Sequence, residues 1–291
     1  VIICAYNIET YVSKAIESVL NQTFKDYELI LVNDGSKDNT LNILKEYESK
    51  NGDRIKVIDN VINLGLSKSR NIAISQANGE YIRGPFSSLT FCFHLDGDDL
   101  FYEPDTLKKI NNTIGEDGAD VTYFGVKYVG GDNKVYLPNA ENSTKEARIV
   151  CDMHFAVASK VWKKEFLDRN NITFIENMYY EDMVYSIKAT ILAEKLKYGE
   201  FPIYYYYRNR EGSIMATPNI KRCKDMYKML YYLMELYETT PEELKPYLLS
   251  FINNETRSLP IRINAIIKSM KGNTKAPVLP KRNYKFKKED I

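Results

Sequence analysis

Two acidic motifs contain the side chains best suited to chemistry in this sequence. The first, Asp96-Gly97-Asp98-Asp99, places three carboxylates within four residues. Such charges repel one another and lower stability unless a cation or hydrogen-bond donors compensate them. A magnesium or manganese ion held by one or two carboxylates and by phosphate oxygens fits this run, although an ordinary acidic loop would have the same composition.

The second acidic motif, Glu181-Asp182, stands where a segment with helical periodicity begins. Negative charge at the start of a helix favours the helix dipole by well under about 1 kcal/mol, and this is the simplest interpretation of the pair. An ionised carboxylate in a cleft can also accept the proton of a hydroxyl as a general base. Taken alone, the pair favours the helix-dipole interpretation.

Strands and helices alternate over the first hundred residues. We expect strands at 1–5, 27–32, 55–58, 80–82 and 91–95, and helices at 8–20, 40–47 and 65–77. This alternation with short connections predicts a parallel sheet. Three strands end in polar residues, at Tyr6-Asn7, at Asp34-Gly35-Ser36 and at the Asp96 motif. Because the carboxyl ends of parallel strands meet at one edge, where ligands bind, these residues are expected to share a site.

The rest of the chain is predicted to be mixed and then helical. Periodicity and turn residues predict a helix that begins at Pro104 and a hairpin of 121–129 and 134–137. They also predict helices over 160–169 and from 181, a strand over 197–206, and helices from 219 onward. Lysines and arginines concentrate in the Pro-punctuated end of the chain, which we expect to be a loose tail.

Composition excludes several classes of protein. The chain has 291 residues, of which 44% are hydrophobic and 27% charged, as in ordinary globular proteins. Forty basic and 39 acidic residues give a net charge of +1, which argues against nucleic acid as the main partner. The 4 cysteines form no CxxC pair, so we expect neither disulfides nor a zinc site. This cysteine usage suggests that the protein resides in a reducing cytosol. No apolar run in the sequence approaches the roughly 18 residues that a membrane-spanning helix needs, and we expect no signal peptide.

Taken together and in order, the motifs resemble those of the family 2 glycosyltransferases, which are inverting, nucleotide-sugar-dependent enzymes of the GT-A fold. The matching segments are Ala5-Tyr6-Asn7, Asn33-Asp34-Gly35-Ser36, Asn63-Leu64-Gly65 with Arg70, Gly79-Glu80-Tyr81-Ile82, Asp96 to Asp99, Glu181-Asp182, and Arg208 to Ser213. The segment 83–90 interrupts the family pattern, and Pro85 predicts a loop or bulge there.

The resemblance covers about residues 1–215 and implies an α/β, Rossmann-like fold whose central sheet is mostly parallel and flanked by helices. It implies a catalytic domain at 1–215, with a nucleotide-binding half at 1–100 and an acceptor half at 101–215. Residues 216–291 would form a helical C-terminal extension with a basic tail. We expect this extension to shape the acceptor side or an oligomer contact.

The resemblance also implies roles for individual residues. Asp182 would be the catalytic base, with Glu181 orienting it or the acceptor. Asp98 would hold Mn²⁺ or Mg²⁺, while Asp99 would order the loop or approach the metal. The remaining roles are nucleotide binding by Ala5, Tyr6, Asn7, Asp34, Arg70 and Asp96, diphosphate binding by Arg208, Arg210 and Ser213, and acceptor contacts by Lys160 and Trp162.

The implied reaction transfers a sugar, with UDP as the expected carrier, to a hydroxyl of a glycan or lipid-linked glycan used in surface polysaccharide, capsule or oligosaccharide synthesis. The enzyme would be cytoplasmic, and its basic tail could contact the inner face of the membrane. An inactive nucleotide-sugar or carbohydrate-binding domain of the same fold is the alternative, although binding alone needs no Asp182. A sugar nucleotidyltransferase would carry an early glycine-rich loop, and residues 5–12 contain no glycine.

Overall fold

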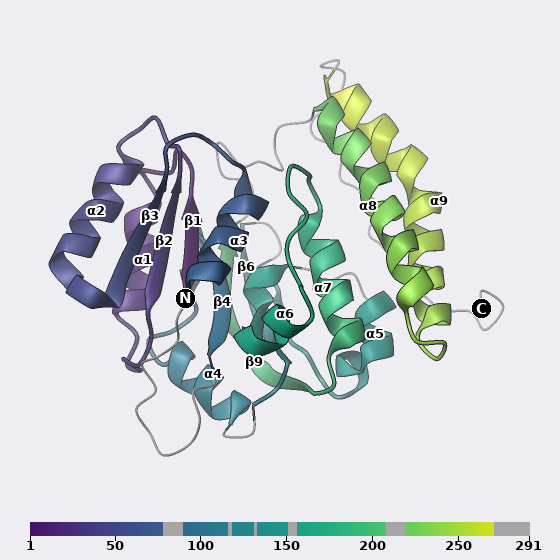
Figure 1. Cartoon of the computed structure of the whole chain (residues 1–291), viewed down its shortest axis with the longest axis horizontal. Helices are drawn as coiled ribbons and strands as arrows, with labels where there is room; N and C mark the ends of the chain where they lie inside the picture. Colours follow the sequence, from purple (N-terminus) through teal and green to yellow (C-terminus); the bar gives the residue numbers. More distant parts are fainter. Residues whose placement is uncertain (78–89, 116–117, 131–132, 151–155, 208–218, 271–291) are drawn as a thin grey trace.

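The computed structural model describes residues 1–77, 90–115, 118–130, 133–150, 156–207 and 219–270. Within these ranges the strands form a nine-stranded sheet in the order β3-β2-β1-β4-β8-β6-β9-β5, with β7 paired to β6 (Figure 1). The strands are β1 Ile2–Ala5, β2 Leu29–Asp34, β3 Ile55–Asn60, β4 Phe91–Asp96, β5 Leu100–Phe101, β6 Val121–Val129, β7 Val135–Tyr136, β8 Lys160–Lys163 and β9 Leu196–Tyr207.

The sheet is mixed, with four parallel and four antiparallel strand pairings, so the mostly parallel arrangement that was predicted holds for β1 to β4 and not for the whole described sheet. Strands β3, β2, β1 and β4 pair in parallel, and β9 pairs in parallel with β6. Strand β8 runs antiparallel to both β4 and β6, and the short strands β5 and β7 are antiparallel to their partners. The hairpin expected from 121 to 137 is confirmed by β6 and β7, whereas the strand expected at 80–82 lies outside the described residues.

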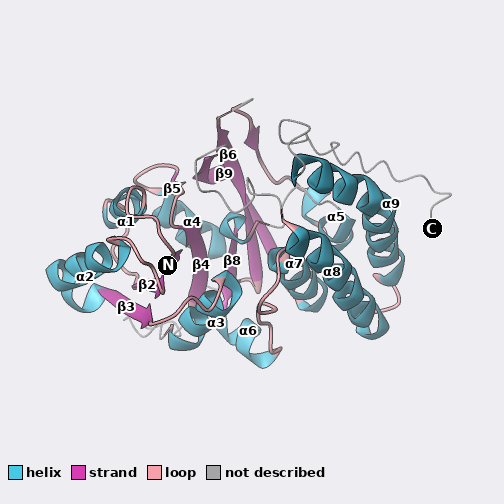
Figure 2. Cartoon of the chain, turned by 90° about the horizontal axis from the view of Figure 1, so that it is seen from above, coloured by secondary structure: helices cyan, strands magenta, loops and turns pink. Residues whose placement is uncertain are grey.

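Helices cover both faces of the sheet, which explains why its strands are apolar on both sides. On β1, Ile3 packs with helices α1 Val12–Leu20, α2 Thr40–Asn51 and α4 Thr106–Ile114. Ile2 belongs to the apolar cluster on the other face, with residues of helices α3 Leu66–Gln76, α6 Lys164–Arg169 and α7 Glu181–Leu192. Figure 2 shows these three helices on one side of the sheet. The predicted helix-flanked α/β fold is therefore confirmed.

The helix predicted over 160–169 is wrong for its first four residues. Residues Lys160–Lys163 form β8, and the helix α6 begins only at Lys164. Val161 and Trp162 point to opposite faces of the sheet and enter different apolar clusters. Pairing with β4 on one side and β6 on the other satisfies the backbone of this segment, so tertiary context outweighs its local helical pattern.

The C-terminal part consists of two long helices, α8 Ile220–Thr239 and α9 Lys245–Met270, which lie side by side (Figure 1). They pack on α7 and on α5 Lys145–Val150 through one apolar cluster that includes Ile187, Met226 and Phe251. In the described part of the chain no helix combines the length and apolar character needed to cross a membrane.

Candidate active site

Asp34 lies at the carboxyl end of β2 and organises the loop that leads from β3 into α3. Its buried carboxylate accepts hydrogen bonds from the backbone N–H of Leu64 at 2.8 Å, from that of Gly65 at 2.9 Å and from the amide of Asn60 at 3.2 Å. These bonds hold the loop across the end of β2. The loop passes so close that a Cβ on Gly35, whose φ is +69°, would lie 2.5 Å from the backbone nitrogen of Asn63.

The loop after β1 is fastened to the loop after β2. Asn7 has a φ of +51°, its N–H donates to Ser36 Oγ at 3.1 Å, and its side-chain oxygen accepts from the N–H of Lys37 at 2.7 Å. Ala5 is buried, while the ring of Tyr6 is exposed beside this network. The strand-end residues predicted to hold a nucleotide therefore lie together at the carboxyl edge of the parallel strands.

Arg70 joins the two acidic motifs. Its Nη2 donates to Asp96 Oδ1 at 2.9 Å and its Nη1 donates to Glu181 Oε1 at 3.0 Å. The side chain is only 5% exposed, and the guanidinium lies 5.2 Å from the centre of the Phe174 ring. The end of β4 and the start of α7 thus face one buried cation, so motifs far apart in the sequence form one site.

The two carboxyls at the start of α7 hold protons more tightly than ordinary carboxyls. Burial, together with the neighbouring Asp182, raises the pKa of Glu181 to about 7, and Arg70 opposes this change. Burial also raises the pKa of Asp182, against the opposing charges of Arg70 and Lys160. Burial alone would lower the pKa of Arg70, but Asp96 and Glu181 raise it overall, so the guanidinium stays charged.

The three carboxyls of the Asp96 motif have different environments. Asp96 is paired with Arg70. Asp99 is buried, and its Oδ1 accepts the N–H of Tyr207, the last residue of β9, at 3.1 Å. Asp98 is half-buried in the turn between them. Among the described residues, no three His, Cys, Asp or Glu side chains cluster in a way that could hold a metal by themselves.

Lys160 and Trp162 do not lie where an acceptor could reach them, so their predicted role as acceptor contacts is corrected. Trp162 is fully buried in the centre of the sheet, where its ring packs edge-on against Tyr185 at 5.0 Å. Lys160 is also buried and donates to the carbonyl of Ala156 at 2.9 Å. Burial lowers the pKa of Lys160 well below its ordinary value, against the opposing charge of Asp182.

Arg208, Arg210 and Ser213, predicted to bind the diphosphate, lie outside the described residues. Several residues on other elements contact the site without having been predicted from the sequence. Phe174 lies under Arg70, and Asp225 and Arg262 contact the residues just before Glu181. No local pattern marks these side chains, because their role depends on tertiary packing.

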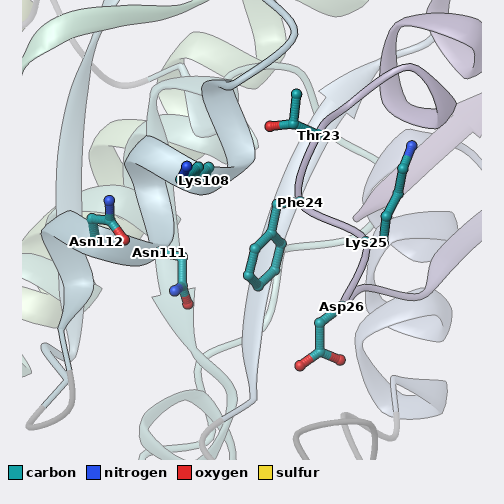
Figure 3. Close-up of a pocket in the computed structure, with 7 residues that line it drawn as sticks. All are labelled: Thr23, Phe24, Lys25, Asp26, Lys108, Asn111 and Asn112. Carbon is teal, nitrogen blue, oxygen red and sulfur yellow. The ribbon is translucent and has the colours of Figure 1, made fainter.

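A shallow hollow of about 450 Å³ lies elsewhere on the molecule (Figure 3). It is lined by residues of the loop before β2 and of α4, namely Thr23, Phe24, Lys25, Asp26, Lys108, Asn111 and Asn112. These loop residues precede β2, whereas the acidic motifs follow their strands at the carboxyl edge. The hollow is therefore separate from the candidate site.

The chain belongs to glycosyl transferase family 2, whose model matches residues 1–165. It is 26% identical over 234 residues to the poly(ribitol-phosphate) beta-N-acetylglucosaminyltransferase TarS of Staphylococcus aureus, covering 79% of this chain and 39% of TarS. It is 30% identical over 240 residues to the cholesterol galactosyltransferase of Borreliella burgdorferi, covering 76% of this chain and 62% of that protein. The chain thus spans less than two thirds of either relative.

Solved structures confirm the fold. The crystal structure of S. aureus TarS 1-349 in complex with UDP-GlcNAc has a TM-score of 0.69 and 25% identity, covering 87% of this chain and 71% of that one. The mannosyltransferase PcManGT from Pyrobaculum calidifontis, in complex with GDP-Man and Mn²⁺, has a TM-score of 0.60 at 16% identity and supports the fold alone. The family and the GT-A fold expected from the motifs are confirmed.

Proposed function

We propose that this protein is an inverting glycosyltransferase that moves a sugar from UDP to a hydroxyl of a glycan or lipid-linked glycan acceptor. The observation that supports it most is that Arg70 donates one hydrogen bond to Asp96 and another to Glu181 within a family 2 chain. It brings the acidic motif of the donor side and the acidic pair of the acceptor side to one place. A protein that only binds nucleotide sugars would have no need of this convergence.

The donor would lie at the carboxyl edge, against Ala5, Tyr6, Asn7, Asp34 and Asp96. The TarS structure that contains UDP-GlcNAc supports UDP as the carrier. The names of relatives that glycosylate poly(ribitol-phosphate) support an acceptor in a surface polymer. Since both arms of the buried Arg70 guanidinium are bound to carboxylates, we propose that Arg70 acts on the nucleotide through Asp96 rather than by direct contact.

A divalent ion fits the Asp96 motif. Mg²⁺ and Mn²⁺ bind through one or two carboxylates and complete their shells with phosphate oxygens and water. Asp98, half-buried in the turn of this motif, is the carboxylate that we propose would hold the ion. When bound, such an ion would neutralise negative charge that develops on the departing diphosphate.

Asp182 would act as the base. The acceptor oxygen would form a bond to the anomeric carbon while the bond from that carbon to the diphosphate breaks, and the electron pair would leave with the diphosphate. The hydroxyl proton would move to Asp182, and attack from the opposite face would invert the anomeric centre. Burial that raises the pKa of Asp182 makes its carboxylate a stronger base than an exposed aspartate.

A cytoplasmic location, at the inner membrane face when the acceptor is lipid-linked, is part of the proposal. Cys4, Cys92 and Cys223 are unbonded thiols, which suits a reducing compartment. Contact of the basic tail with membrane, oligomer formation and the division of the chain at residues 100 and 215 stay predictions.

A donor panel tests the proposal. Nucleotide sugars are offered to the protein with and without Mn²⁺, and binding is measured by thermal shift and transfer or hydrolysis by release of UDP. We expect a UDP-sugar to bind more tightly with Mn²⁺, and Asp182→Asn to keep that binding while losing transfer. Tight binding with no turnover by the wild-type protein would favour the inactive binding domain. Loss of binding in Asp182→Asn would show that Asp182 is structural.

A further inference from the structure

Two of the four residues before the acidic pair of α7 have a left-handed backbone conformation. Tyr180, which directly precedes Glu181, has a φ of +66°, and Asn177 has a φ of +58°. A bulky residue such as tyrosine rarely adopts this left-handed conformation. The side chain of Tyr180, the N-cap residue of α7, makes no capping hydrogen bond. Such a conformation persists only where surrounding contacts fix it, so those contacts control where Glu181 and Asp182 point.

Helix α8 supplies the first set of contacts. Asp225, which is 1% exposed, accepts the backbone N–H of Tyr179 at 3.0 Å through Oδ2. Lys221 is paired with the same carboxylate at 2.5 Å and donates to the carbonyl of Asn177 at 2.7 Å. One buried carboxylate and one lysine thus hold both the start and the middle of the strained turn.

Helix α9 supplies the second set of contacts to the residues before Glu181. The guanidinium of Arg262 lies 5.5 Å from the centre of the Tyr180 ring, and its Nη1 donates to Glu255 Oε2 at 2.6 Å. Both charged groups are buried. A buried ion pair often contributes little net stability compared with apolar residues of similar size. Its place here is better explained by the orientation it gives Arg262 against Tyr180.

We propose that the α8–α9 pair is a working part of the active site and that Asp225 and Arg262 are positioning residues for the acidic pair of α7. The proposal rests on the proposed role of Asp182 and Glu181. Both helices lie beyond residues 1–165, the part that matches the family model. Apolar packing of Met226 and Phe251 with Ile187 fixes the two helices on α7, so they provide a rigid reference for the turn.

The test compares Asp225→Ala with Asp225→Asn and with a control variant of Asp120, a residue that contacts the backbone just beyond the C-terminal end of α7. Asp120 is likewise a buried carboxylate, and it accepts the N–H of Glu194 at 2.8 Å and of Lys195 at 3.1 Å just after α7 ends. We expect Asp225→Ala to lower kcat about 10- to 100-fold, because misplacement of a reacting group by about 1 Å costs on that order. The donor KM should change less than about twofold, since the donor site is built on other elements.

Asp225→Asn should recover most of kcat, because its amide oxygen can still accept the N–H of Tyr179. Asp120→Ala should lower Tm while leaving kcat and its pH profile unchanged. A second variant, Glu255→Leu with Arg262→Met, replaces the buried pair by apolar side chains. It should therefore fold and still show a reduced kcat with a shifted pH profile.

Wild-type kcat in both Asp225→Ala and the double variant would overturn the inference, as would an equal loss of kcat in Asp120→Ala. These results differ from failure of the proposed function. In that case the wild-type protein itself would transfer no sugar from any donor, or Asp182→Asn would remain active, and the inference would fall with it.

Discussion

The guanidinium of Arg70 donates to Glu181 across 3.0 Å and so joins helix α3 to the first residue of helix α7. Its other arm holds Asp96 at the end of β4. One buried cation therefore keeps two carboxylates of separate motifs in contact. Its charge also limits how far burial can raise the pKa of the acidic pair.

We expect Arg70→Met to lower the free energy of unfolding by about 3 kcal/mol, because it leaves Glu181 buried without its cation. Sugar transfer should be lost as well. Chemical denaturation and an end-point transfer assay measure these effects. The control is Lys68→Met on the same helix, which breaks the exposed pair with Glu176 and should cost under about 1 kcal/mol. Equal effects of the two changes would contradict the importance of the Arg70 contacts.

Transfer and stability should depend on pH in opposite directions. The pKa of Glu181 is raised from 4.5 to about 7, so the folded protein binds a proton more tightly than the unfolded chain. The contribution of Glu181 to stability is thus present below pH 4.5 and is lost as the pH rises through 7. Transfer needs the proposed base Asp182 in its ionised form, and burial raises the pKa of that carboxyl, so kcat should rise with pH as Asp182 loses its proton.

Measurements on Glu181→Gln separate this effect from other titrations. The difference in unfolding free energy between wild type and variant should change with pH between 4.5 and 7 and be constant above that interval. A difference that does not vary with pH would mean that Glu181 titrates normally.

Gly35→Ala should lower donor affinity as well as Tm. The added Cβ would meet the backbone of Ile62 and Asn63 at 2.5 Å and push the loop held by Asp34 away from the end of β2. The matched control is Gly52→Ala. Gly52 also has a positive φ, of +57°, but nothing lies within 4 Å of an added Cβ. Both variants should lose stability, while calorimetry with UDP should detect weaker binding only for Gly35→Ala.

Trp162→Phe should leave the acceptor KM unchanged, because the indole lies in the core and offers no face to a sugar. Trp162→Ala should cost about 3–5 kcal/mol in unfolding free energy, as expected when a large buried aromatic is removed. Steady-state kinetics with varied acceptor and thermal denaturation are the measurements. A raised acceptor KM in a Trp162→Phe protein of normal Tm would restore the acceptor role.

The sequence predicted the parallel strands and the convergence of polar residues, because alternating apolar segments determine which strand ends share an edge. It did not predict that 160–163 forms a strand, since the partners Cys92 and Val121 lie far away in the sequence. The sequence placed Arg70 in the site but did not predict its hydrogen bonds to Asp96 and Glu181. The contacts of Asp225 and Arg262 with the turn before α7 depend on helix packing that no local motif records.

The central position of β8 has a consequence for how new specificities could arise. Its backbone is hydrogen-bonded to β4 on one side and to β6 on the other, so the described sheet is continuous from the parallel strands β3, β2, β1 and β4 to the strands β6 and β9. Separating the two sides of this sheet would require breaking the backbone hydrogen bonds between β8 and its neighbours β4 and β6. Loop segments can therefore diverge or be exchanged between relatives while the frame that carries them stays the same.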